Sequence, residues 1–485
     1  MSLKSKLIPV TALIMLFIFL IKSSIYNPEI TVGNDLLWHL EYGKRIIETR
    51  GIPQTDWLSW TFEGTNYQVT QWLGQVVLAG AHIVGGSTLL NLVLASTLSL
   101  IFGLSWLTAR LYLKSSFLAL LVALLTCHQV FAVNARPQVF GFAMFAALVW
   151  LLAVWFEQKK RWALLCIPVV LMLWANLHGS FIVGVLYIAA LGGGAWMASF
   201  YTSGWNFPAS VKLHFALAVS AFTAIFATLI NPYGYEAYLY VLSISQLETT
   251  TSGLITEWRA TSMSTMNGPS FILISLLSFV AMLLSNIKAT PQRAVGFVGT
   301  VYFGLSADRQ TYFAVIAMVP FLAQALSNSK ITELMSKSDE PKASAIHAIL
   351  SVSAMGALWF ILHSLSAPFI ENQFQRLYPV AAVKWLNENK IEGRIFNHME
   401  SGGYIGSTGR KVFFDGRLDL FGDKFSIGTL NALEGKTGWR DFIERYKPEV
   451  YILKNDDELK KLLTESMSLP VAYEDDYHSV IIDRR

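Results

Sequence analysis

The sequence predicts a polytopic α-helical membrane protein that carries a small α/β domain at its C-terminal end. Of its 485 residues, 53% are hydrophobic and only 14% are charged, against roughly 25% charged in an ordinary soluble domain. Apolar runs, several of them about 18 residues or longer and so able to cross a bilayer as helices, recur as far as residue 366. Beyond that point, helical and strand patterns alternate in a more polar chain.

The composition also excludes several classes of protein. The net charge of +4, from 37 Lys and Arg against 33 Asp and Glu, is too small for a nucleic-acid-binding surface. The only two cysteines, Cys127 and Cys166, lie inside apolar runs, which excludes a disulfide framework and a thiolate metal site. We therefore expect membrane lipids, and no nucleic acid, among the partners.

The first apolar run, 7–21, follows Lys4 and Lys6 as the core of a signal peptide would. No small-residue cleavage site follows it, so we expect a retained first span. The further candidate spans are 87–109, 116–133, 138–155, 163–177, 180–198, 213–230, 269–285, 294–307, 311–328 and 346–366. The sequence thus predicts about eleven spans.

Lys and Arg in the loops give the orientation. If the N-terminus is cytoplasmic, the short cytoplasmic loops hold about twice as many Lys and Arg as the outer loops before the last span. We therefore predict a cytoplasmic N-terminus, a membrane domain over 1–366 and an outer domain over 367–485. Helices are expected in the outer domain at 379–390, 423–434 and 439–446, with strands at 394–397, 411–414, 449–453 and 479–483.

Polar residues gather on the predicted outer face, at span ends and in outer loops. They are Asp35, His39, Asp56, Arg136, Asn176, His178, Asn231, Glu257, Asp308 and Arg309. Ionisable groups at a membrane boundary cost free energy unless they are paired or line a wet cavity, so this distribution indicates a site on that face. The alternative is that loops are simply polar.

The first outer loop, predicted over 23–86, is long for a connection and is therefore expected to be functional. Asp35 and His39 share a helical face in it. A carboxylate at this position can accept the proton of an attacking hydroxyl, and a general base of this kind contributes roughly 10²–10⁴ in rate. The alternative is that Asn34 or Asp35 is only a helix N-cap.

One carboxylate beside arginines suits the displacement of a phosphate from a sugar's anomeric carbon. A leaving phosphate, with a second pKa of about 6, needs cations more than a proton donor. Arg136 and Arg309 could supply them, although each could equally be an arginine that anchors a helix at the headgroups. Glycoside hydrolysis needs two carboxyls, and Asp56 or Glu257 could supply the second, so hydrolysis remains open.

Several motifs in this order resemble a bacterial membrane family of the GT-C glycosyltransferase superfamily. They are Asn34-Asp35-x-x-Trp38-His39-Leu40, Ala135-Arg136-Pro137-Gln138, Asn176-Leu177-His178-Gly179, Asn231-Pro232-Tyr233-Gly234, Glu257-Trp258, Gly402-Gly403-Tyr404 and Phe414-Asp415-Gly416-Arg417. The resemblance covers residues 33–485 and implies a GT-C-like bundle in the bacterial inner membrane, with the C-terminal domain in the periplasm. It further implies a polyprenyl-phosphate-linked sugar donor, a glycan, lipid or protein acceptor, and Asp35 as the catalytic residue.

The chain departs from the superfamily in its acidic residues. Leu36 follows Asp35 where an acidic pair is common, and no Asp-x-Asp lies near Arg136. We therefore predict no required cofactor, and leave open a Mg²⁺ or Mn²⁺ ion that would need Asp35 together with Asp56 or Glu257.

The predicted substrate-binding residues are His39, Asp56, Arg136, Asn176, His178, Glu257 and Arg309. Asn176 and His178 could bind a sugar hydroxyl or phosphate, or could instead pair across helices. A rival function is a non-enzymatic carrier or flippase for a lipid-linked glycan. Such carriers usually show inverted repeats and polar residues at mid-span, whereas here the polar residues lie on one face.

Overall fold

The computed structural model describes residues 35–130, 135–202, 207–251, 255–286, 290–327 and 375–485. The predicted spans at 7–21 and 346–366, the start of the first outer loop and Asn34 lie outside these ranges. The other nine predicted spans each overlap a helix, and residues 131–133 of the span at 116–133 and residue 328 lie outside these ranges.

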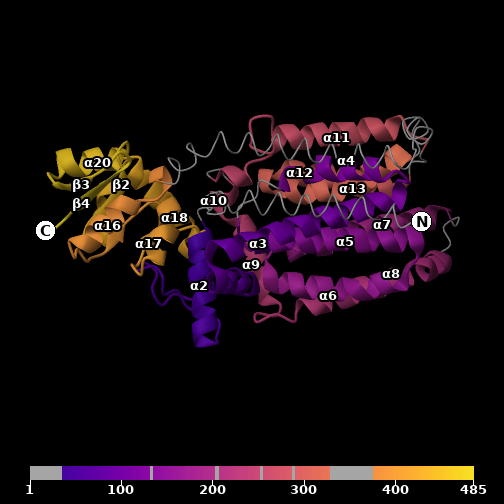
Figure 1. The fold of residues 1–485 in the computed structure, drawn as a ribbon, viewed down its shortest axis with the longest axis horizontal. Helices are drawn as coiled ribbons and strands as arrows, with labels where there is room; N and C mark the ends of the chain where they lie inside the picture. Colours follow the sequence, from indigo (N-terminus) through magenta and orange to yellow (C-terminus); the bar gives the residue numbers. More distant parts are fainter. Residues whose placement is uncertain (1–34, 131–134, 203–206, 252–254, 287–289, 328–374) are drawn as a thin grey trace.

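The membrane domain is a bundle of helices that run side by side along the long axis of the molecule (Figure 1). Its helices are α3 (Trp72–Tyr112), α4 (Ser116–Cys127), α5 (Gln138–Gln158), α6 (Arg161–Leu177), α7 (Phe181–Thr202), α8 (Phe207–Thr228), α11 (Gly268–Leu283), α12 (Pro291–Ser306) and α13 (Thr311–Ser327). Four stretches, at Trp72–Tyr112, Gln138–Gln158, Phe181–Phe200 and Asp308–Ser327, are both long and apolar enough to cross a bilayer. The chain is a multi-pass membrane protein.

Aromatic packing and close helix contacts hold the bundle together. Phe313 of α13 packs against Phe142 and Phe145 of α5 and is stacked on Trp174 of α6. A Cβ on Gly304 would lie 2.2 Å from a ring carbon of Phe271, so α12 approaches α11 closely only because that residue is glycine. Large apolar side chains such as Leu165 and Phe222 are exposed on the outside, as expected for helices that face lipid.

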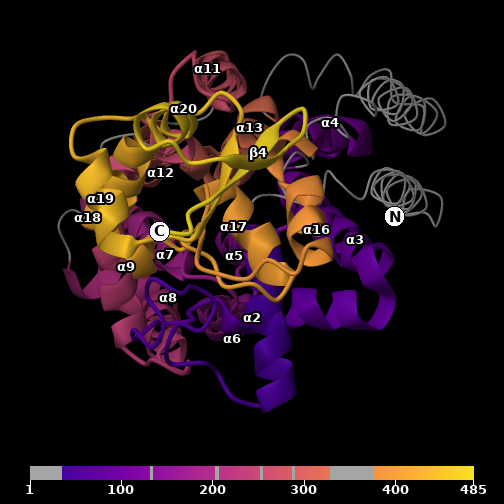
Figure 2. The ribbon, with the colours of Figure 1, turned by 90° about the vertical axis from the view of Figure 1, so that its left-hand side faces the viewer.

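One end of the bundle carries a short helix, α2 (Leu36–Thr49), which lies across it in Figures 1 and 2. Gly43 brings α2 onto α3, since a Cβ there would lie 2.2 Å from the carbonyl oxygen of Gln75. The same end holds α9 (Glu236–Gln246), α10 (Glu248–Thr251) and two 3₁₀ helices, η2 (Thr256–Trp258) and η3 (Asp308–Gln310). The helix α3 begins inside the predicted loop 23–86 and is kinked at Gly85 and Gly86.

The C-terminal domain is a four-stranded sheet with helices around it. Its elements are α16 (Val380–Glu388), β1 (Ile395–Phe396), α17 (Met399–Ser407), α18 (Leu418–Leu433), α19 (Trp439–Tyr446), β2 (Val450–Lys454), α20 (Glu458–Lys461), the π-helix η4 (Leu462–Ser466), β3 (Val471–Glu474) and β4 (His478–Ile482). The strand order is β1-β2-β4-β3. The β1–β2 pair is parallel and the other two pairs are antiparallel. This confirms the small α/β domain.

One predicted strand, 411–414, is wrong. Within this segment Val412 forms a single bridge, with Ser59 of the first outer loop, instead of joining the sheet. Helix α17 was not predicted, because its Gly402 and Gly403 disfavour a helix in an isolated sequence. Both differences arise where the C-terminal domain packs on the first outer loop, a contact between residues more than three hundred positions apart.

Two hydrophobic clusters serve the C-terminal domain. One lies inside it and includes Leu386, Val450 and Val480. The other is shared, because Trp38 and Tyr42 of α2 pack in the same cluster as aromatic residues of the C-terminal domain. The C-terminal domain is therefore packed on α2 and the loop that follows it.

Candidate active site

Asp35 occupies the N-cap position of α2, but its side chain makes no capping hydrogen bond. Its Oδ1 accepts a hydrogen bond from Nε1 of Trp38 at 3.2 Å. Its Oδ2 lies 3.2 Å from Nη1 of Arg136, in the turn before α5. The carboxylate therefore turns away from the helix end and toward an arginine of the bundle.

Four of the predicted residues form one continuous set of charges, here called the charged row: Asp35, Arg136, Glu257 and Arg309. Glu257, in η2, lies between the two arginines, with Oε2 3.5 Å from Nη1 of Arg136 and Oε1 3.6 Å from Nη1 of Arg309. The guanidinium of Arg309 also lies over the Trp258 ring, 4.3 Å from its centroid. Four separate segments of the chain thus meet at the end of the bundle that carries α2.

The charged row is partly open to solvent. The side chains of Asp35, Arg136 and Arg309 are 23%, 21% and 19% exposed, and that of Glu257 is 40% exposed. Nε of Arg136 is buried and donates no hydrogen bond to any described residue. The row therefore keeps donor capacity for an anionic ligand.

Burial and neighbouring charges shift the pKa values of the two carboxyl groups of the charged row in opposite directions. Burial raises the pKa of Asp35, although the Arg136 guanidinium opposes it and Glu257 adds to it. Burial alone would raise the pKa of Glu257, but Arg309 and Arg136 outweigh it and lower that pKa. Asp35 is thus the more basic of the two carboxylates, as a proton acceptor should be.

The two predicted histidines are buried beside the row without touching it. His39 is 3% exposed, and its Nδ1 lies 3.0 Å from Nε2 of Gln75. Burial, followed by the charge of Arg136, lowers the pKa of His39 well below its usual value, so His39 is neutral at pH 7. His178 follows α6, and its Nδ1 lies 2.8 Å from Oγ of Ser180.

Asn176 is fully engaged in joining helices. Its Oδ1 accepts from Nε1 of Trp72 at 3.0 Å, and its Nδ2 donates to the carbonyls of Met172 and Ile230, both at 2.8 Å. This is the arrangement expected of a polar residue that pairs between helices. None of these three hydrogen bonds involves a residue of the charged row.

Asp56 lies in a second, fully buried network, here called the Arg417 network: Tyr42, Asp56, Asp415 and Arg417. The side chains of Asp56, Asp415 and Arg417 are completely buried. Nε of Arg417 donates to Oδ1 of Asp415 at 2.8 Å, and Nη1 donates to Asp56 and to the Tyr42 hydroxyl. Burial would raise the pKa of Asp56, but Arg417 and the Ser59 hydroxyl lower it.

The donor set of the charged row does not suit a divalent cation. Asp35 and Glu257 each face an arginine, and Asp56 is held by Arg417. Within the part of the chain that the structure describes, no three His, Cys, Asp or Glu side chains converge as metal ligands.

Two residues of the C-terminal domain near the charged row, Tyr378 and Gly416, were not predicted from the sequence. Tyr378 is 1% exposed, and its pKa is raised by burial and by Asp35, while Arg136 opposes the shift. Gly416 lies against Asp35, where an added Cβ would be 2.1 Å from Oδ1. The motif Phe414-Asp415-Gly416-Arg417 was the sequence feature that could have drawn attention to Gly416, but nothing in the motif indicates a contact with Asp35.

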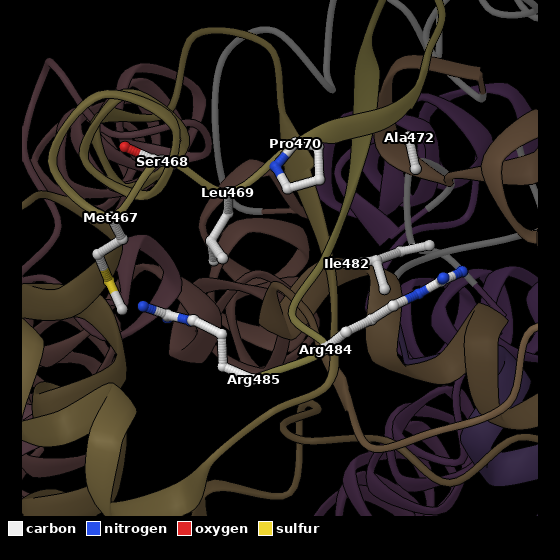
Figure 3. Close-up of a pocket in the computed structure, with 8 residues that line it drawn as sticks. All are labelled: Met467, Ser468, Leu469, Pro470, Ala472, Ile482, Arg484 and Arg485. Carbon is white, nitrogen blue, oxygen red and sulfur yellow. The ribbon is translucent and has the colours of Figure 1, made fainter.

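A hollow of about 360 Å³ in the C-terminal domain lies elsewhere (Figure 3). It is lined by Met467, Ser468, Leu469, Pro470, Ala472, Ile482, Arg484 and Arg485. Arg485 pairs with Asp483 at 2.8 Å, and the side chains of Arg484 and Arg485 point in different directions. None of the predicted site residues lines it.

Three solved structures share this fold. ArnT from Cupriavidus metallidurans bound to undecaprenyl phosphate aligns over 98% of this chain and 97% of its own, at 13% identity and a TM-score of 0.53. Its apo state gives the same identity and coverage with a TM-score of 0.54. The oligosaccharyltransferase of Archaeoglobus fulgidus, in complex with Zn and sulfate, aligns over 91% of this chain and 68% of its own, at 12% identity and a TM-score of 0.53.

No protein-family model and no curated protein sequence matches the chain. The likeness is therefore one of fold, and it extends over nearly the whole chain.

Replacing Arg417 by Met should strongly destabilise the protein. It leaves two buried carboxylates without their cation, a change that typically costs about 3–5 kcal/mol. A clear fall in the thermal unfolding temperature of the detergent-solubilised protein is expected. Arg440→Met, which removes an exposed pair with Glu444, should leave that temperature almost unchanged. Equal unfolding temperatures for R417M and the wild type would contradict the role given to this network.

Proposed function

Since the fold is that of the GT-C membrane glycosyltransferases, we propose that this protein transfers a sugar from a polyprenyl-phosphate donor to an acceptor hydroxyl. The reaction takes place on the periplasmic face of the bacterial inner membrane, with the N-terminus in the cytoplasm. The observation that carries the proposal is the charged row, in which Asp35, a carboxylate of raised pKa, contacts Arg136, and Glu257 links Arg136 to a second arginine, Arg309. The undecaprenyl phosphate bound to ArnT supports a donor of this class.

In this proposal Asp35 is the general base. The acceptor oxygen attacks the anomeric carbon, its proton passes to Asp35, and the bond from that carbon to the phosphate oxygen breaks. The electron pair of that bond remains on the phosphate. Burial raises the pKa of Asp35, although the charge of Arg136 and the hydrogen bond from Trp38 oppose it, and a more basic carboxylate favours proton acceptance as the new bond forms.

Arg136 and Arg309 stabilise the leaving phosphate. Phosphate monoesters carry close to two negative charges near neutral pH and bind arginine through short, charged hydrogen bonds. The Glu257 carboxylate lies between the two guanidiniums, with one oxygen facing each. Its contacts with them, at 3.5 and 3.6 Å, are long for ion pairs. A phosphate of higher charge can therefore compete with Glu257 for both arginines, and the unpartnered Nε of Arg136 offers a further donor.

Asp35→Asn should abolish transfer, because the amide cannot accept the proton. A fall of about 10²–10⁴ in rate is expected, with the protein still folded in the membrane. The measurement is donor consumption by mass spectrometry, using purified protein and a panel of polyprenyl-phosphate sugars. Glu48→Gln, on the exposed side of the same helix, is the matched control and should retain activity.

Transfer at the wild-type rate in D35N would remove Asp35 from the mechanism. A carrier or flippase would give a different result from a glycosyltransferase. It would move the lipid between leaflets of a vesicle while leaving the sugar attached to its phosphate, and wild-type protein would consume no donor.

Arg309→Ala should weaken the binding of polyprenyl phosphate, the leaving group of the proposed reaction. A hydrogen bond to a charged group contributes about 1.5–3 kcal/mol, which corresponds to roughly ten- to hundredfold in affinity. The measurement is the Kd for undecaprenyl phosphate in detergent or nanodiscs. Lys44→Ala, which removes an exposed cation from α2, should leave that Kd unchanged. An unaltered Kd in R309A would show that Arg309 does not contact the phosphate.

A further inference from the structure

The C-terminal domain approaches Asp35 through the backbone of Gly416. A Cβ on this residue would lie 2.1 Å from Oδ1 of Asp35, 3.1 Å from its Cγ and 3.3 Å from Nε1 of Trp38. These are the two groups that make the hydrogen bond at the start of α2. A side chain at position 416 would therefore displace the carboxylate or the loop.

The loop that carries Gly416 is fastened to the first outer loop on one side. Val412 donates its backbone N–H to Leu58 at 3.1 Å, and its carbonyl accepts from the N–H of Trp60 at 3.0 Å. The Thr61 hydroxyl donates to the carbonyl of Phe413 at 2.7 Å. The Arg417 network then fixes the residue that follows Gly416.

The loop is fastened to the C-terminal domain on its other side. Asn397 brackets it, with Nδ2 donating to the carbonyl of Phe414 at 2.8 Å and Oδ1 accepting from the N–H of Phe413 at 2.9 Å. Gly402 of α17 lets the helix rest directly on the loop, since a Cβ there would lie 2.2 Å from the Phe414 carbonyl oxygen. Residues 412–417 are thus held in place by hydrogen bonds and close packing between the first outer loop and the rest of the C-terminal domain.

The remaining access to Asp35 is narrow. Trp38 occupies Oδ1 and Arg136 occupies Oδ2, yet 23% of the side chain is still exposed. An acceptor hydroxyl must reach the carboxylate through this opening. Gly416 bounds it on the side of the C-terminal domain, and Arg136 bounds it on the side of the bundle.

We propose that the C-terminal domain forms the acceptor-side wall of the active site, and that Gly416 is a positioning residue whose lack of a side chain lets the loop 412–417 pack against Asp35 and hold its carboxylate where the acceptor hydroxyl can reach it. This rests on the proposed function. The donor comes from the bilayer to the arginines, and the hydroxyl-bearing acceptor enters from the aqueous side, between α2 and the loop 412–417.

The first test separates chemistry from donor binding. In Gly416→Ala, the transfer rate at saturating donor should fall about a hundredfold, the loss typical of a misplacement of about 1 Å at a reacting group. The Kd for undecaprenyl phosphate should stay within about twofold, because the arginines are untouched. Gly51→Ala, in the first outer loop and with no heavy atom closer than 3.9 Å to the added Cβ, should match the wild type in both. Wild-type transfer by G416A, or a loss of lipid binding in it, would overturn the proposal.

The second test needs no activity. If Gly416 and Asp35 are in contact, the fall in unfolding temperature caused by Gly416→Ala should be at least halved in an Asp35→Ala background, because contacting residues are not additive. Equal falls in unfolding temperature in both backgrounds would show that Gly416 and Asp35 are not in contact, and would overturn the proposed acceptor-side wall. If D35N retains transfer, Asp35 is not the general base, but the coupling between Gly416 and Asp35 can still be observed. Failure of the proposed function can therefore be distinguished from failure of this inference.

Discussion

The ion pair between Asp35 and Arg136 is the contact on which the rest of the site depends. A carboxylate at the outer end of an apolar bundle is desolvated, which favours its neutral form. The guanidinium 3.2 Å away opposes that tendency and holds the carboxylate toward the bundle. Because Arg136 also faces Glu257, the same contact connects the base to the second arginine.

Helix α2 connects the charged row to the Arg417 network. Asp35 precedes its first residue, and Trp38, His39 and Tyr42 follow at intervals that place them on one face. The N-terminal end of that face meets Arg136, and Tyr42 meets Arg417 of the C-terminal domain. Gly43 seats the helix on α3. One short helix therefore sets the position of the base relative to both the bundle and the C-terminal domain.

The bundle and the charged row could be predicted because each depends on local patterns. Apolar runs become helices wherever they are long enough, and residues at the outer ends of spans meet at one face of a bundle. Asp35, Arg136, Glu257 and Arg309 were found in this way. Asp56 met the same criterion but pairs with Arg417, 361 positions away, and no spacing reveals a partner at that distance. Gly416 was also inaccessible to sequence reasoning, since its importance lies in its close approach to Asp35, a residue far away in the sequence.

The account is tested most directly by the pH dependence of sugar transfer at saturating donor. Asp35 must be ionised to accept the proton, and burial raises its pKa above the usual 3.8. The rate should be constant near neutral pH and fall as the pH decreases through a single pKa above that value. A rate that stays constant down to pH 3.8 would contradict Asp35 as the base.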